Sequence, residues 1–353
     1  MSYTLRARPP RHSLRQWMAC VALLCASGMP VSAAENAAWK PSKTPEFIVP
    51  SGAGAALDVA ARKLTELLVR DGYASSFIVS NKSSAHGIVA LESLHRTAGD
   101  GHTLMTLSTS YGNSLAQNAV PAHLQNGTPL VTLFREFVTV VVRADSPLQN
   151  AHDLIAHLKQ DPGKFSIGIA QTLGNHIHLG AAQPLKQAGV DIHGLRIIPY
   201  KSSAESMNAL VGGHLDVVSA TTPNLLPYLQ SGRVRVLAIA AEQRLGGAFA
   251  SAPTWKEQGV NYVSDSFQGV MAGPGITAAQ QAYWVSALQK VTDSQEWKDF
   301  VRLNQWEPWF HGPKQTAGLL KRQVSSSHAL LAQLGLLPEQ AARVAQASTR
   351  NTR

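Results

Sequence analysis

Short apolar runs alternate along this chain with segments whose apolar residues recur every three or four positions. After the run at 46–49, for example, Leu57, Ala61, Leu64 and Leu68 follow one another at helical spacing. The first pattern predicts β-strands and the second predicts amphipathic helices. Strands and helices that alternate in this way are typical of an α/β fold with mostly parallel sheets flanked by helices.

The alternation continues almost to the end of the chain and suggests an inserted second lobe. The apolar run at 137–142 is interpreted as a strand that leaves the first lobe, and the strand pattern at 267–271 as the return to it. The predicted domains are lobe one at 45–142 plus 266–338, lobe two at 143–265, and a small, polar, flexible tail at 339–353. Other strands are predicted at 77–79, 103–107, 165–169, 194–199, 215–218 and 234–239, and helices at 56–69, 88–94, 153–158, 278–291, 297–303 and 316–334.

Residues 1–34 have the pattern of a cleavable secretory signal peptide. Four arginines and no acidic residue precede an apolar run at 17–24, and small residues follow as far as Ala34. The apolar run is too short to cross a bilayer as a stable anchor. We therefore predict cleavage near residues 33–34 and export of the mature chain.

Cysteine content and charge exclude several classes of function. Both cysteines, Cys20 and Cys25, lie in the leader, so the mature chain has no disulfide and no thiolate nucleophile. Lipidation at Cys25 is an alternative, although Leu24 stands where a small residue is usual. The formal net charge of +9 falls to +5 once the four leader arginines are removed. This surplus is spread along the chain without a basic and aromatic run, so nucleic acid is not expected as a partner.

Three loops after predicted strands carry small, hydroxyl and amide residues. They lie at 50–58, 108–113 and 171–178. Free N–H groups at a helix start attract anions, and polar side chains at strand carboxyl ends can bind a ligand. Ordinary surface turns are the alternative. The spacing Gly52-x-Gly54 resembles a dinucleotide fingerprint without its third glycine, which argues against a Rossmann site, and Asp58 alone is typical of a first helical turn.

Neither a metal site nor a catalytic site is predicted. His176 and His178 invite a metal hypothesis, but side chains two positions apart on a helix diverge by roughly 200°. No acidic residue and no third histidine stand nearby. Motifs for a nucleophile elbow, a zinc protease or a phosphate-binding loop do not occur, so we expect no enzyme activity, no metal and no cofactor.

Motifs spread over most of the mature chain resemble one receptor family. The sequence Asp-Gly-His-Thr-Leu at 100–104 is similar to an Asp-Gly-Tyr-Thr-Leu signature of the extracytoplasmic receptors of tripartite tricarboxylate transporters, the Bug family. The similarity runs from about residue 47 to 337. Further matching segments lie at 49–50, 58–62, 145–147, 153–154, 162–165, 199–201, 212–216, 231–234 and 252–254.

This resemblance implies a two-lobed periplasmic binding protein of the type II-like Venus flytrap kind. Such a monomeric receptor would close on a small organic acid and deliver it to membrane transporter subunits. A periplasmic sensor for a membrane kinase is the alternative, and an exported hydrolase using His178 or Asp58 is a weaker one. The implied ligand-binding residues are Ser51, Gly52, Ala53, Gly54, Ala55, Asp58, Ser108, Thr109, Tyr111, Thr172, Gly174, Asn175, His178, Tyr200, Thr221 and Thr222.

The chain departs from the family pattern at positions that bear on the ligand. Leu57 stands where relatives commonly have threonine, and Ala220 stands where they often have aspartate. The usual Gly-Ala-Gly-Gly is Ser-Ala-His-Gly at 84–87. Leu57 and Ala220 predict a cleft that is more apolar and less receptive to an amine.

Overall fold

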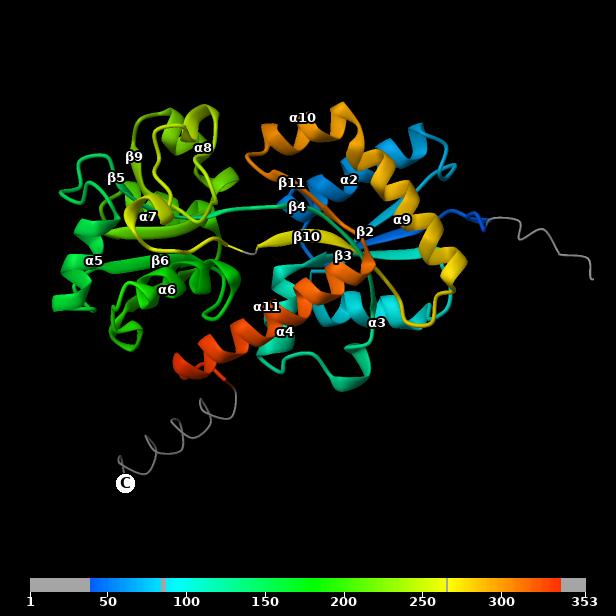
Figure 1. Cartoon of the computed structure of the whole chain (residues 1–353), viewed down its shortest axis with the longest axis horizontal. Helices are drawn as coiled ribbons and strands as arrows, with labels where there is room; N and C mark the ends of the chain where they lie inside the picture. Colours follow the sequence, from blue (N-terminus) through cyan, green and yellow to red (C-terminus); the bar gives the residue numbers. More distant parts are fainter. Residues whose placement is uncertain (1–38, 84–86, 265, 338–353) are drawn as a thin grey trace, which may run out of the picture. The chain divides into compact units, whose positions relative to one another are not determined.

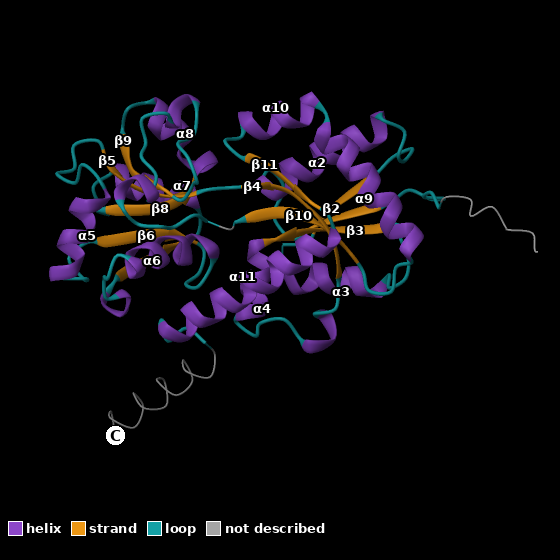
Figure 2. Cartoon of the chain, viewed as in Figure 1, coloured by secondary structure: helices purple, strands orange, loops and turns teal. Residues whose placement is uncertain are grey.

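The computed structural model describes residues 39–83, 87–264 and 266–337 (Figure 1). Two sheets organise this part of the chain, and helices flank each of them (Figure 2). The first sheet has the strand order β11-β4-β10-β3-β1-β2, and the second has the order β7-β6-β8-β5-β9. We call the first sheet with its helices lobe one and the second sheet with its helices lobe two.

The elements have the following bounds. The strands are β1 (Glu46–Val49), β2 (Ile78–Asn81), β3 (Thr103–Ser108), β4 (Thr128–Arg135), β5 (Val138–Arg143), β6 (Ser166–Ala170), β7 (Arg196–Tyr200), β8 (Val217–Thr221), β9 (Val234–Ile239), β10 (Phe267–Ala272) and β11 (Glu307–His311). The α-helices are α2 (Ala56–Arg70), α3 (Ile88–Arg96), α4 (Thr109–Ala116), α5 (Ala151–Gln160), α6 (His176–Gln187), α7 (Ser203–Val211), α8 (Thr222–Gln230), α9 (Ala278–Asp293), α10 (Gln295–Leu303) and α11 (Pro313–Gln333).

Lobe one is a layered structure with helices on both faces of its sheet. Helices α2, α9 and α10 lie on one side of the strands, and α3, α4 and α11 lie on the other (Figure 2). All six residues of β3 are buried because both faces of this central strand are covered. Helix α2 buries Ala61, Leu64 and Leu68, which confirms the apolar stripe predicted from the spacing.

The two largest hydrophobic clusters among the described residues of lobe two use alternate residues of the same strands. Val140 and Val142 of β5 pack with Leu154, whereas Val141 packs with Met207 of α7. Successive side chains of a strand point to opposite faces of its sheet. An uninterrupted apolar run such as 138–142 is therefore explained by burial on both faces.

Both sheets are mixed, so the expectation of mostly parallel sheets is only partly right. Strands β2, β1 and β3 are mutually parallel, as are β7, β6 and β8. Strands β10, β4 and β11 pair antiparallel in lobe one, as β5 does with β8 and β9 in lobe two. Apolar periodicity predicts a strand but not the direction of its neighbour, and β4 and β11 were not recognised in the sequence.

The first passage between the lobes lies earlier than predicted. The strand at 137–142 is confirmed, but its assignment to lobe one is wrong, because β5 pairs with β8 and β9 of lobe two. The unrecognised β4 is the strand that ends in lobe one, and only Glu136 and Phe137 separate it from β5. An apolar run shows that a strand is buried, but not which sheet buries it.

Several predictions fall on residues that are not described. These are the leader at 1–34, the tail at 339–353, and Ser84, Ala85 and His86. Within residues 39–83, 87–264 and 266–337, no helix has both the length and the apolar character needed to cross a membrane.

Candidate functional site

A cavity of about 420 Å³ lies where loops of both lobes meet. Lobe one contributes the loop after β1 and the start of α4, and lobe two contributes the loop after β6. Five of the residues predicted from the sequence line it. They are Ser51, Ser108, Tyr111, Thr172 and Asn175.

Hydrogen bonds to the Asp58 carboxylate fix the loop after β1. Asp58 is 2% exposed, and its carboxylate accepts hydrogen bonds from the Gly54 N–H at 2.8 Å, Arg62 Nε at 3.0 Å and Asn81 Nδ2 at 2.9 Å. Asn81 Nδ2 also donates to the Ser51 carbonyl at 3.1 Å. Burial by itself raises the pKa of Asp58, but the donors, Arg62 first, outweigh burial and lower it. Asp58 therefore positions the loop, and the Gly54 amide is already engaged.

The segment after β3 forms helix α4 rather than the loop expected from the sequence. The Ser108 hydroxyl caps this helix by accepting from the Tyr111 N–H at 3.4 Å. The Thr109 hydroxyl turns away from the cavity and accepts from the Phe267 N–H at 2.8 Å. Burial raises the pKa of Tyr111 to about 12, so its hydroxyl keeps its proton at neutral pH.

The loop after β6 ends in a compact helix cap. Asn175 Oδ1 accepts from the His178 N–H at 2.9 Å, and Asn175 Nδ2 donates to the Ala170 carbonyl at 2.7 Å. His178 Nδ1 accepts from the Gly174 N–H at 2.9 Å, so the ring proton lies on Nε2. Burial lowers the pKa of His178 to about 4, which keeps the ring neutral. His178 and Gly174 thus support the loop beneath Thr172.

The remaining predicted residues do not line this cavity. Tyr200 packs against the lobe-two cluster around Val141 and Met207. Thr221 accepts from Asn224, and the Thr222 hydroxyl donates to the Gln305 carbonyl. Outside the lining are Gly52, Ala53, Gly54, Ala55, Asp58, Thr109, Gly174, His178, Tyr200, Thr221 and Thr222.

Sequence reasoning missed several polar residues that line the cavity. Three of them lie in or near the loops predicted as ligand loops, namely Ser110, Gln117 and Gln171. Thr106, in contrast, lies inside strand β3. Among the described lining residues, three buried atoms have no hydrogen-bond partner. They are Ser51 Oγ, Thr106 Oγ1 and Asn113 Nδ2. Buried polar atoms are normally paired, so these three indicate a place for a polar guest.

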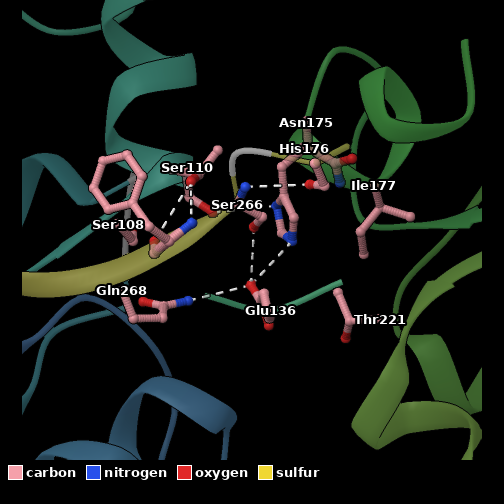
Figure 3. A network of polar contacts seen from close by, with 12 residues as sticks. Ser108, Ser110, Glu136, Asn175, His176, Ile177, Thr221, Ser266 and Gln268 are labelled. Carbon is pink, nitrogen blue, oxygen red and sulfur yellow. Dashed lines mark hydrogen bonds and ion pairs between the residues drawn. The ribbon is translucent and has the colours of Figure 1, made fainter. Parts of the chain in front are cut away.

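A polar network around Glu136 joins the two passages between the lobes (Figure 3). The Glu136 carboxylate accepts from Ser266 Oγ at 3.3 Å and Gln268 Nε2 at 3.2 Å, and lies 3.6 Å from His176 Nε2. Ser110 Oγ lies 3.5 Å from the other nitrogen of His176. Burial lowers the pKa of His176, and the nearby carboxylate opposes this shift. Lobe-two helix α6 is thereby connected to α4 of lobe one.

The two histidines of the His-x-His pair have different surroundings. His176 faces Glu136 and Ser110, whereas His178 is buried against the Gly174 amide. The described part of the chain contains no group of three histidine, cysteine, aspartate or glutamate residues arranged to hold a metal ion.

The chain is similar to one known receptor family and to individual proteins of bacteria. The model of the "Tripartite tricarboxylate transporter family receptor" matches residues 60–336. A relative from Cupriavidus necator, the UPF0065 protein in gbd 5'region, is 28% identical over 91% of this chain and 96% of its own length. Protein BugT of Bordetella pertussis is 28% identical over 69% of this chain and 75% of its own length.

Solved structures share the fold. A TctC solute binding protein from Polaromonas, solved without ligand, superposes with a TM-score of 0.70 at 23% identity, covering 83% of this chain and 99% of that one. The R. palustris protein Rpa4515, solved with adipate, also gives 0.70 at 22% identity, covering 84% and 98%. These likenesses confirm the predicted two-lobed α/β fold.

Proposed function

Because this chain belongs to the tripartite tricarboxylate transporter receptor family, we propose that it captures a small organic anion in the cavity between its lobes. In the periplasm, it then delivers the anion to the membrane subunits of a transporter. The chemistry needed from the chain is recognition alone, because the family consists of receptors.

One observation carries this proposal: hydroxyl and amide side chains from both lobes line a single cavity. Ser51 and Ser110 come from lobe one, and Gln171 and Thr172 come from lobe two. A carboxylate loses its hydration when it is enclosed, and hydrogen bonds from N–H and O–H groups offset that loss. Only a ligand that contacts both lobes favours their closed arrangement over an open one.

Gln171→Glu tests the site with almost no change in side-chain volume. Gln171 is exposed and lines the cavity, so the substitution places a negative charge beside the bound anion. Two like charges about 5 Å apart near a protein surface repel by several kcal/mol, so we expect at least about tenfold weaker binding. Gln160→Glu is the matched control, because Gln160 is also exposed in lobe two but lies at the end of α5, outside the lining.

The assay is isothermal titration calorimetry of the mature protein with a panel of mono-, di- and tricarboxylates. Adipate belongs in the panel because the R. palustris protein of the same fold was solved with it. Native mass spectrometry of the protein as purified would reveal a retained acid. Equal affinities of the two glutamate variants, or no binding of any acid, would refute the proposed site.

Delivery to a transporter requires a separate test. Uptake of the identified acid into proteoliposomes containing the membrane subunits is expected only when this protein is added with its ligand. Uptake that does not depend on this protein would count against transport and in favour of the sensory alternative.

A further inference from the structure

The hydrocarbon that lines the cavity comes from one lobe only. Each described lining residue from lobe two is polar, namely Gln171, Thr172 and Asn175. The apolar lining side chains all come from lobe one. They are Pro50, Leu57, Leu91, Met105 and Ala119. Lobe one also contributes polar lining residues, among them Ser51, Thr106 and Asn113. A ligand that fills the cavity therefore meets hydrogen-bonding groups on both lobes, but it meets hydrocarbon only at lobe one.

The apolar side reaches the hydrophobic core of lobe one. Leu91 of α3, Met105 of β3 and Tyr111 of α4 belong to the core cluster that also contains Ile48 and Leu107. Leu91 is 2% exposed and Met105 is 1% exposed. Because these side chains are packed on their other sides, they form a fixed wall that a ligand can contact without rearranging the core.

We propose that this wall is a specificity subsite for the hydrocarbon body of a monocarboxylate. The inference rests on the proposed function and adds the class of acid. The ligand's carboxylate lies toward Ser51 and Thr172, and its carbon chain lies against Leu91 and Met105. Every described residue that lines the cavity is uncharged.

A second carboxylate at the far end of the ligand is disfavoured on this wall. It would lose its hydration against leucine and methionine side chains without gaining a charged partner among the described lining residues. Each methylene group that is buried there instead strengthens binding, by about fourfold in affinity. The subsite therefore selects acids by chain length and by the absence of a distal charge.

The unmodified mature protein provides the first test. Titration calorimetry with acetate, butanoate, hexanoate and adipate compares chain length and distal charge directly. We expect hexanoate to bind about tenfold or more tightly than butanoate, as two further buried methylenes require. We expect adipate, which has the same number of carbons as hexanoate, to bind more weakly than hexanoate.

Ala119→Phe provides the second test by filling the apolar side. Ala119 is exposed and lines the cavity, so a larger side chain is accommodated without disturbing the core. We expect hexanoate affinity to fall at least about tenfold and acetate affinity to stay within about twofold. Ala122→Phe is the control, because Ala122 is exposed but lies outside the lining.

The outcomes separate this inference from the proposed function. If adipate binds more tightly than hexanoate, or if affinity does not rise with chain length, the subsite is refuted while the receptor function stands. Unchanged hexanoate binding by Ala119→Phe would also refute it. If none of these four acids binds the unmodified protein but another acid of the wider carboxylate panel does, the subsite is refuted while the receptor function stands. If no acid of either panel binds, both the subsite and the proposed function fail.

Discussion

Replacing Asp58 with asparagine should loosen the loop that carries Ser51. The Asp58 carboxylate accepts hydrogen bonds from the Gly54 N–H, Arg62 Nε and Asn81 Nδ2, at 2.8, 3.0 and 2.9 Å. Asparagine keeps one acceptor oxygen but presents an NH₂ group where the second carboxylate oxygen was. At least one of these donors then faces another donor.

The magnitude follows from the burial of each partner. A hydrogen bond to a buried charged group contributes about 1.5–3 kcal/mol. The Arg62 side chain is 53% exposed, so its ion pair with Asp58 contributes at most about 1 kcal/mol. We expect the free energy of unfolding to fall by about 2–3 kcal/mol at neutral pH, which lowers Tm by about 3–5 °C for a chain of this size. Because Ser51 is repositioned, acid affinity should also fall about threefold to tenfold.

Thermal unfolding followed by circular dichroism, together with titration calorimetry, measures both effects. Glu66→Gln is the matched control, since Glu66 lies on the same helix and its side chain is 62% exposed. The folded pKa of Asp58 lies below its ordinary value of 3.8, so its stabilising contribution is present above that pH. It is lost as pH falls through the folded pKa, and the Tm difference between wild type and Asp58→Asn should shrink accordingly.

Equal Tm values for Asp58→Asn and Glu66→Gln at pH 7 would refute the anchoring role of Asp58. A lowered Tm with unchanged acid affinity would show that Asp58 stabilises the fold without setting the position of Ser51. A Tm difference that grows as the solution is acidified would contradict the assigned direction of the pKa shift.

Three further predictions concern protonation and packing. Burial lowers the pKa of His178 to about 4, so as pH drops the unfolded state binds a proton before the folded state does, and the free energy of unfolding should fall between about pH 6.5 and 4. In chemical denaturation at several pH values, the free energy of unfolding of His178→Gln should depend less on pH than that of the wild type, and an equal dependence would contradict this. Gly269→Ala would place a methyl group 2.2 Å from the Val131 carbonyl oxygen, so its Tm should fall by an amount equivalent to about 1–3 kcal/mol or more. Gly52→Ala should leave Tm nearly unchanged because the space around Gly52 is open, and similar Tm values for the two variants would argue against the packing of β10 on β4. Burial raises the pKa of Tyr111 to about 12, so acid affinity measured by calorimetry should not change through ionisation of its hydroxyl between about pH 7 and 10. Tyr111 lines the cavity, so Tyr111→Phe should weaken acid binding at every pH in this range, and unchanged affinity would contradict a contact between the hydroxyl and the ligand.

The amino-acid sequence alone determined most of the local structure. The stripe at Ala61, Leu64 and Leu68 predicts helix α2, and the run at 103–107 predicts β3, because each pattern depends on neighbours a few positions away. The motif order also identified the family. The loops that follow β1 and β6 were recognised as candidate ligand loops from their small and polar residues.

Only the tertiary structure decided which residues of those loops reach the cavity. Thr109 was predicted to contact the ligand, but its hydroxyl accepts from the Phe267 N–H, 158 positions along the chain. Thr222 likewise donates to the Gln305 carbonyl. Thr106 gave no signal because it lies inside a buried strand.

The assignment of β5 to lobe two was decided in the same way, since a strand's sheet is chosen by pairing with distant strands. Apolar periodicity is a local property and is visible in the sequence. Hydrogen bonds and strand pairs between distant segments form only in the folded chain, and they determine which side chains remain available to a ligand.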